Sequence, residues 1–283
     1  METTKELIDH LTLEQIEYNI FRGESHSIGS PRVFGGQVLA QALEAATLTV
    51  PNDRLVHSLH GYFILGGDID RPIIYDVNRI RDGNSFTTRR VVAIQHGRAI
   101  FNMSASFHGE EEGFDHHIEM PEVTPPESLE DDTEAFKKIR HQLPEKAQAW
   151  LDIPRPIEFR SVEHPIMSKM QKGHGQHIWF RAKGQVPDDQ HWHRTILAYA
   201  SDYNLLSTAL RPHAITFLQL KLAASLDHAM WFHRDFSVND WLLYALDSPS
   251  ASGARGFTRG NIFDRKGRLV ASVVQEGLIR KKD

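Results

Sequence analysis

The first hundred residues show one helical pattern followed by four strand-like patterns. Between Phe34 and Thr49, apolar and small side chains recur three or four residues apart, which predicts an amphipathic helix. The segments after it are separated by the turn sequences Asp82-Gly83-Asn84 and His96-Gly97. We therefore predict an antiparallel meander with strands over 55–65, 73–81, 85–95 and 99–107.

The C-terminal part of the chain repeats this order of patterns. We predict a helix from about Trp192 to Leu210 and four strands over 222–233, 241–247, 254–263 and 269–279. Short sequences also recur 170 or 171 residues apart, which indicates an internal repeat, with chance matching as the alternative. The matching pairs are 55–57 with 226–228, 86–87 with 257–258, and 97–100 with 267–270.

The predicted helices are rich in small residues, such as Gly35, Gly36 and Ala42 in the first helix. Small side chains let a helix lie close to a curved sheet, and a helix wrapped by an antiparallel sheet is the hotdog architecture. We therefore predict the α+β class and a double hotdog with one continuous sheet. The N-terminal module is expected over 1–108, a linker over 109–155 and the C-terminal module over 156–283.

The predicted linker differs from the two modules in composition. Residues 109–134 carry 11 acidic residues and no Lys or Arg, and seven of the 13 prolines fall between 121 and 165. A short surface helix is predicted over 132–149. Outside the acidic run, 32 basic residues stand against 26 acidic ones, and this net charge of +6 suits a small phosphate-bearing ligand better than nucleic acid. The alternative is a solvated acidic linker on an ordinary body.

The chain of 283 residues contains no cysteine, which excludes disulfides, a thiolate nucleophile and sulfur-ligated zinc. It shows no signal peptide and no apolar stretch long enough to span a membrane, so we expect a cytoplasmic protein. Motifs for a serine-hydrolase elbow, a phosphate-binding loop, a dinucleotide site and a zinc protease are missing. The spacings among the 17 histidines match no known ligand set, so no metal and no cofactor are expected.

Asp202 is the residue that most strongly suggests chemistry. In the predicted helix it shares a face with Ala198 and Leu206, which lie four residues before and after it. Burial would raise the pKa of this carboxyl group and make it a better base near neutral pH. The alternative is a carboxylate at the edge of the apolar stripe that reaches solvent.

Four further polar residues are candidates on the predicted strands. Gln275 lies in the last strand, and it points inward if its face of the sheet covers the helix. A buried amide needs partners, which Asp202 and a water could supply. Ser225 lies at the beginning of the strand after the second helix; an outward Gln and a strand-end Ser are the alternatives. His57 and His228 occupy equivalent repeat positions, which favours packing for both over a role as base.

Five runs of this sequence resemble acyl-CoA thioesterase II, the TesB type. The resemblance covers nearly the whole chain, and the runs are long and occur in the family's order. They are Val33-Phe34-Gly35-Gly36-Gln37, Leu55-Val56-His57-Ser58-Leu59-His60, Arg81-Asp82-Gly83-Asn84-Ser85-Phe86, His228-Ala229-Met230-Trp231-Phe232-His233-Arg234 and Val274-Gln275-Glu276-Gly277.

The resemblance implies hydrolysis of acyl-CoA thioesters to a fatty acid and coenzyme A. It implies a catalytic trio of Asp202, Ser225 and Gln275, with Ser225 at a position where we expect Thr more often. Water would attack the thioester carbonyl directly, with Asp202 as the base or orienting group and the other two holding the water. Backbone N–H groups at a helix N-terminus, such as the one that begins at Gly35-Gly36, are candidates for stabilising the oxyanion.

Two other functions stay open at this point. A non-catalytic acyl-CoA-binding module would bind the substrate without releasing thiol. A hotdog enoyl-CoA hydratase would carry an Asp-x-Asn-Pro-x-x-His-like motif, which neither Asp202 nor Asp53 begins here. Because hotdog proteins commonly pair their sheets across subunits, we expect a homodimer or homotetramer.

Overall fold

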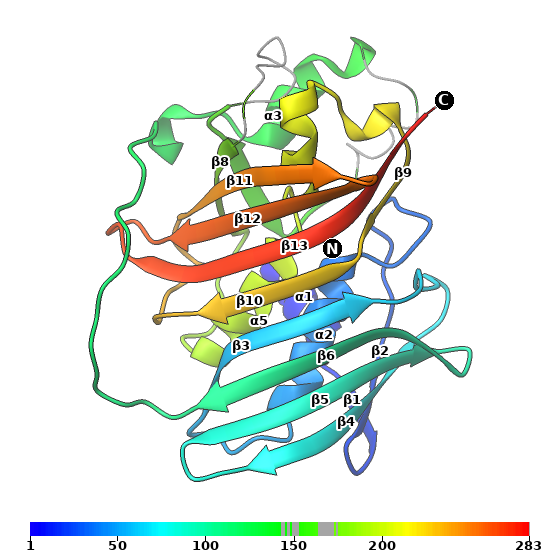
Figure 1. The fold of residues 1–283 in the computed structure, drawn as a ribbon, viewed down its shortest axis with the longest axis vertical. Coiled ribbons are helices and arrows are strands. Elements are labelled where there is room, and N and C mark those ends of the chain that lie inside the picture. The colour runs from blue at the N-terminus through cyan, green and yellow to red at the C-terminus, as the bar shows by residue number, and fades with distance from the viewer. Residues whose placement is uncertain (143–144, 146–147, 149–152, 164–172, 174, 283) are drawn as a thin grey trace.

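One antiparallel sheet organises the molecule. The computed structural model describes residues 1–142, 145, 148, 153–163, 173 and 175–282, and within these ranges thirteen strands form this sheet (Figure 1). The strand order is β1-β2-β4-β5-β6-β3-β10-β13-β12-β11-β8-β7, and β9 pairs with β13 beside this path.

The N-terminal half contains the first predicted helix and all four strands predicted after it. Each of these elements agrees with its prediction to within two residues at either end. One helix and two strands before them were not predicted. The elements are α1 (Thr4–Leu11), β1 (Glu14–Glu17), β2 (Ile20–Gly23), α2 (Gly35–Thr47), β3 (Leu55–Phe63), β4 (Ile73–Asp82), β5 (Phe86–Gln95) and β6 (Arg98–His108).

The C-terminal half corrects two predictions. The second helix, α5, ends at Ser201, and a separate 3-10 helix, η3, follows it. The strand predicted over 222–233 is divided at Leu226 into β9 and β10. Strands β7 and β8 were not predicted. The elements are β7 (Ile157–Ser161), β8 (Gly175–Ala182), α5 (Gln190–Ser201), η3 (Leu206–His213), η4 (Phe217–Gln219), β9 (Leu220–Ser225), β10 (Asp227–Phe232), β11 (Leu242–Ser252), β12 (Arg255–Phe263) and β13 (Leu269–Lys281).

The segment after β6 crosses the outer face of the C-terminal half, and it rises along the left side of the sheet in Figure 1. Its apolar residues Met120, Val123 and Leu129 cover a small cluster formed by Trp179, Trp241, Leu243 and Phe263. Of the surface helix predicted over 132–149, α3 covers the first seven residues and ends at Lys138, and the 3-10 helix η2 follows it. The part of that prediction at Leu143 and Ala147 lies outside the described residues. The elements are η1 (Pro126–Ser128), α3 (Asp132–Lys138) and η2 (Arg140–Gln142).

The two halves are related by the order of their strands. The order β2-β4-β5-β6-β3 in the N-terminal half corresponds to β8-β11-β12-β13-β10 in the C-terminal half. The halves join where β3 pairs with β10, in a register that sets Leu59 opposite Met230 and Gly61 opposite His228. The predicted α+β double hotdog with one continuous sheet is confirmed.

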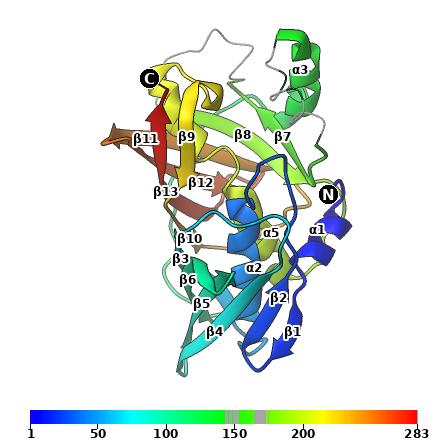
Figure 2. The same cartoon turned by 90° about the vertical axis from the view of Figure 1, so that its right-hand side faces the viewer.

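The sheet curves around the two central helices, α2 and α5, which lie side by side on its inner face (Figure 2). Every residue of α2 from Gly36 to Ala46 is buried. The helix is enclosed by the sheet and by α5, which explains its small side chains. Among the residues that the structure describes, no helix has both the length and the apolar character needed to cross a membrane.

Candidate functional site

Asp202 lies where the two central helices meet. It is the C-cap residue of α5, and its Oδ2 accepts a hydrogen bond of 2.9 Å from the backbone N–H of Gly36 in the first turn of α2. Two glycines permit this approach. A Cβ on Gly35 would lie 2.7 Å from Asp202 Oδ2, and one on Gly36 would lie 2.4 Å from the carbonyl oxygen of Tyr199. The positive end of the α2 dipole therefore faces the carboxylate.

Gln275 and Ser225 reach the same carboxylate from the sheet. Gln275 lies on β13, is fully buried, and donates an Nε2–H to Asp202 Oδ1 at 2.8 Å. Ser225 is the last residue of β9 and pairs with Gly277, two residues beyond Gln275 on β13. The Ser225 hydroxyl lies near Asp202 and lowers the pKa of its carboxyl group. The structure thus brings together the three residues predicted as the site.

Burial and hydrogen bonding act in opposite directions on Asp202. Its side chain is 8% exposed. Burial raises the pKa of the carboxyl group above 3.8. The hydrogen bonds from Gln275 and Gly36, together with the nearby Ser225 hydroxyl, only partly offset this rise. The result is a carboxylate that binds a proton more readily than an exposed aspartate does, as a general base near neutral pH requires.

The two repeated histidines have different surroundings. His228 is fully buried, with Nδ1 3.2 Å from Gln275 Nε2 and Nε2 3.0 Å from Ser201 Oγ. Burial lowers the pKa of His228 to about 3, so the ring is neutral. The ring of His57 instead lies 2.8 Å from the hydroxyl of Ser106, in the N-terminal half. Packing is the role expected for both histidines. His228 in addition contacts Gln275, and this contact arises from the pairing of β10 with β13.

Comparison with known proteins gives the family. Residues 21–108 match the family model of the acyl-CoA thioesterase N-terminal domain, and residues 155–278 match that of acyl-CoA thioesterase. The chain is 43% identical over 277 residues to Acyl-CoA thioesterase 2 of Haemophilus influenzae, and the alignment covers 97% of this chain and 96% of that protein. The chain belongs to the acyl-CoA thioesterase family. The resemblance seen in the sequence is thereby confirmed.

Further comparisons agree with this family and with the fold. Acyl-coenzyme A thioesterase 8 of Mus musculus is 41% identical over 96% of this chain and 88% of its own length. The crystal structure of acyl-CoA thioesterase II TesB2 from Mycobacterium marinum aligns with a TM-score of 0.81 at 41% identity, over 97% of this chain and 98% of that one. A hot dog fold protein from Alicyclobacillus acidocaldarius, at 17% identity and a TM-score of 0.79 over 99% and 100% of the two chains, supports the fold alone.

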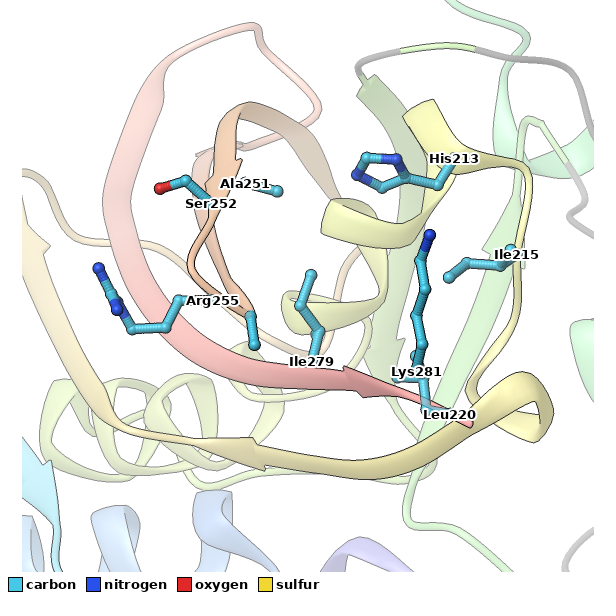
Figure 3. A pocket seen from close by; sticks show the side chains of 9 residues that line it. His213, Ile215, Leu220, Ala251, Ser252, Arg255, Ile279 and Lys281 are labelled. Atoms are coloured by element: carbon cyan, nitrogen blue, oxygen red, sulfur yellow. The ribbon is translucent and has the colours of Figure 1, made fainter. Parts of the chain in front are cut away.

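A pocket of about 140 Å³ lies in the C-terminal half of the molecule (Figure 3). Ile279 and Lys281 of β13 line it, together with residues of η3, β9 and the β11–β12 hairpin. Asp202, Ser225 and Gln275 are not among the residues that line it. The pocket is therefore separate from the site that contains Gln275.

Proposed function

We propose that the site around Asp202 hydrolyses acyl-CoA thioesters to a fatty acid and coenzyme A. The observation that carries this proposal is a buried carboxylate held by Gln275 at 2.8 Å and by the N–H of Gly36 at 2.9 Å. Membership of the acyl-CoA thioesterase family supports the class of reaction.

Asp202 acts as the general base in this proposal. A water beside the carboxylate attacks the thioester carbonyl carbon, and one of its protons passes to Asp202 as the new C–O bond forms. The tetrahedral intermediate then breaks its C–S bond. Coenzyme A leaves as a thiolate that takes the proton from Asp202, and the acyl group leaves as the fatty acid. The reaction requires no acyl-enzyme.

Gln275 holds the attacking water through its oxygen. Its Nε2 donates to Asp202, whereas its Oε1 is buried and has no hydrogen-bond partner within the described part of the chain. A buried acceptor without a partner suits one proton of a water whose other proton faces Asp202. Ser225 lies near the carboxylate and lowers its pKa, which keeps more of it ionised.

The N-terminus of α2 contributes its electrostatic field. The N–H of Gly36 already donates to Asp202, so this amide orients the base rather than binding the oxyanion. The positive end of the helix dipole still stabilises the negative charge that develops on the carbonyl oxygen.

We also propose a cytoplasmic homodimer or homotetramer. The absence of cysteine is compatible with a reducing compartment. Large apolar side chains on the strands, such as Tyr62 and Ile80, are 63% and 55% exposed and supply surface that a second copy could cover. Light scattering on the purified protein tests the oligomer, which a monomer at micromolar concentration would contradict, and fractionation of the source cell tests the compartment.

Thiol release from acyl-CoAs of several chain lengths tests the hydrolysis. The chain has no cysteine, so its own signal with a thiol-reactive dye is negligible. We expect release by the wild type and a loss of at least about 100-fold in kcat for Asp202→Asn. The exposed Asp53→Asn serves as the matched control and keeps wild-type turnover. Binding of acyl-CoA without thiol release would contradict the proposal and favour a binding module.

A further inference from the structure

A chain of hydrogen bonds runs from α5 to the side chain of Gln275. The Ser201 hydroxyl donates to the carbonyl oxygen of Ala198 at 2.8 Å and lies 3.0 Å from Nε2 of His228. Nδ1 of the same ring lies 3.2 Å from Nε2 of Gln275, which donates in turn to Asp202. The serine, the histidine and the glutamine are all fully buried, so water does not compete for these bonds.

These contacts assign the position of each proton in this series of hydrogen bonds. The single hydroxyl proton of Ser201 goes to Ala198, so Ser201 Oγ accepts from His228 and the ring carries its proton on Nε2. Nδ1 then has a free lone pair, which accepts one N–H of Gln275. The other N–H of that amide points at Asp202, so both amide protons have acceptors.

We propose that His228 is a positioning residue that fixes the orientation of the Gln275 amide. If the amide rotated by half a turn, Oε1 would face the Asp202 carboxylate and the lone pair of His228 Nδ1, and both contacts would be repulsive. In the fixed orientation Oε1 stays available to the attacking water. This role therefore rests on the proposed hydrolysis.

The neutral state of the ring supports this role. Asp202 Oδ1 lies 4.0 Å from Nδ1, but burial lowers the pKa of His228 to about 3, so the lone pair persists near neutral pH. Protonation would turn Nδ1 into a donor and remove the acceptor that holds the amide.

The internal repeat supplies a matched control. His57 is the sequence counterpart of His228, 171 residues earlier, and it lies at the register shift between Val56 and Ser58 of β3. Phe107 is the counterpart of Gln275 in the N-terminal half. Phe107 pairs with Thr87 and Gln275 pairs with Thr258, and these two threonines are 171 residues apart. The ring of His57 therefore has no amide at the equivalent position, and its Nε2 bonds to Ser106 instead.

Turnover of three variants tests the proposal. His228→Leu removes the acceptor, and we expect kcat to fall about 10- to 100-fold with little change in KM. His228→Asn places a carbonyl oxygen near the position of Nδ1 and should restore most of kcat. His57→Leu should keep wild-type kcat. Wild-type kcat in a folded His228→Leu would overturn the proposal.

Nitrogen-15 chemical shifts of the His228 ring give a readout independent of turnover. We expect the proton on Nε2 in the wild type, and a proton on Nδ1 would overturn the proposal. Ser201→Ala removes the hydroxyl that fixes this tautomer, so it should admit the other tautomer and lower kcat. This variant also provides the turnover test if His228→Leu does not fold.

Asp202→Asn in the same assay separates this inference from the proposed hydrolysis. If Asp202→Asn keeps wild-type turnover, the hydrolytic mechanism fails, while the tautomer measurement still decides the hydrogen-bond assignment. If Asp202→Asn loses turnover and His228→Leu keeps it, only the role of His228 fails.

Discussion

The two hotdog halves share their strand order, but only the C-terminal half carries the polar trio. Helix α5 is capped by Asp202, whereas α2 is capped by Leu48, which is 50% exposed. On the sheet, the position of Gln275 is taken by the buried Phe107 in the N-terminal half. The same scaffold therefore holds together with and without these polar groups.

The ends of the two helices show what this difference means physically. In the N-terminal half, the fully buried Arg89 donates to the carbonyl and hydroxyl oxygens of Thr49, just beyond the C-terminal end of α2. A cation there is favourable, because a helix C-terminus carries partial negative charge. In the C-terminal half an anion, Asp202, occupies that end of α5, and the N-terminus of α2 compensates it. The C-terminal half therefore has a negative charge, instead of a stabilising positive one, at the end of its central helix, and this is the place where we propose the chemistry.

Gln275→Leu makes the C-terminal half resemble the N-terminal half and should have the largest effect. The change removes both the donor to Asp202 and the acceptor for water, so we expect kcat to fall by about 100- to 10,000-fold. Phe107→Leu is the matched change in the other half. It should lower the free energy of unfolding by about 1–2 kcal/mol and leave kcat unchanged. Thiol-release kinetics and urea denaturation measure both effects, and wild-type kcat in Gln275→Leu would contradict the comparison.

Gly35→Ala tests the contribution of the N-terminal half to the site. The new Cβ would lie 2.7 Å from Asp202 Oδ2 and must displace the carboxylate. We expect kcat to fall about 10- to 100-fold, because small displacements of catalytic groups have effects of this size. Gly113→Ala is the control, since a Cβ at Gly113 meets nothing within 4 Å. Equal turnover in the two variants would show that the position of α2 does not matter.

Arg89→Met should affect stability without affecting turnover. The change leaves the buried oxygens of Thr49 without their donor, so we expect the free energy of unfolding to fall by about 2–3 kcal/mol. The kcat of the folded fraction should equal that of the wild type. A loss of kcat in fully folded protein would mean that the N-terminal half does more than support the fold.

The pH dependence of kcat/KM gives the smallest effect. Burial raises the pKa of Asp202, so activity should rise with pH through a midpoint above 3.8. Ser225→Ala removes a hydroxyl that lowers this pKa, so the midpoint should move upward. A downward shift would contradict the assignment. Because the folded pKa is raised, the protonated carboxyl group favours the folded state below the unfolded pKa, and this stability is lost as pH rises through the folded pKa.

The sequence predicts the strands better than the ends of the helices. Alternation and turn residues are local signals, so both meanders could be placed. The helix predicted to Leu210 is wrong beyond Ser201, because apolar residues continue the helical spacing while Asn204 adopts a φ of 64° and the chain enters η3. Strand β1 has four residues with exposed side chains and gives no pattern.

The candidate site shows the same limit. The apolar face of the predicted helix singled out Asp202, and the strand pattern made Gln275 and Ser225 candidates. The family resemblance then joined these three residues in one trio. The amide of Gly36 and the ring of His228 were not predicted as partners. Their contacts depend on how the N-terminus of α2 meets the C-terminus of α5 and on the pairing of β10 with β13. No local sequence pattern contains that information.

The measurement that tests the account most directly is kcat and the free energy of unfolding of Asp202→Asn on one sample at neutral pH. Removing the buried charge relieves its desolvation, while Gly36 and Gln275 lose part of their acceptor. These changes oppose each other, so we predict a free energy of unfolding within about 1 kcal/mol of the wild type. We predict that kcat falls at least about 100-fold. Wild-type kcat, or a loss of kcat that only follows a loss of folded protein, would contradict the account.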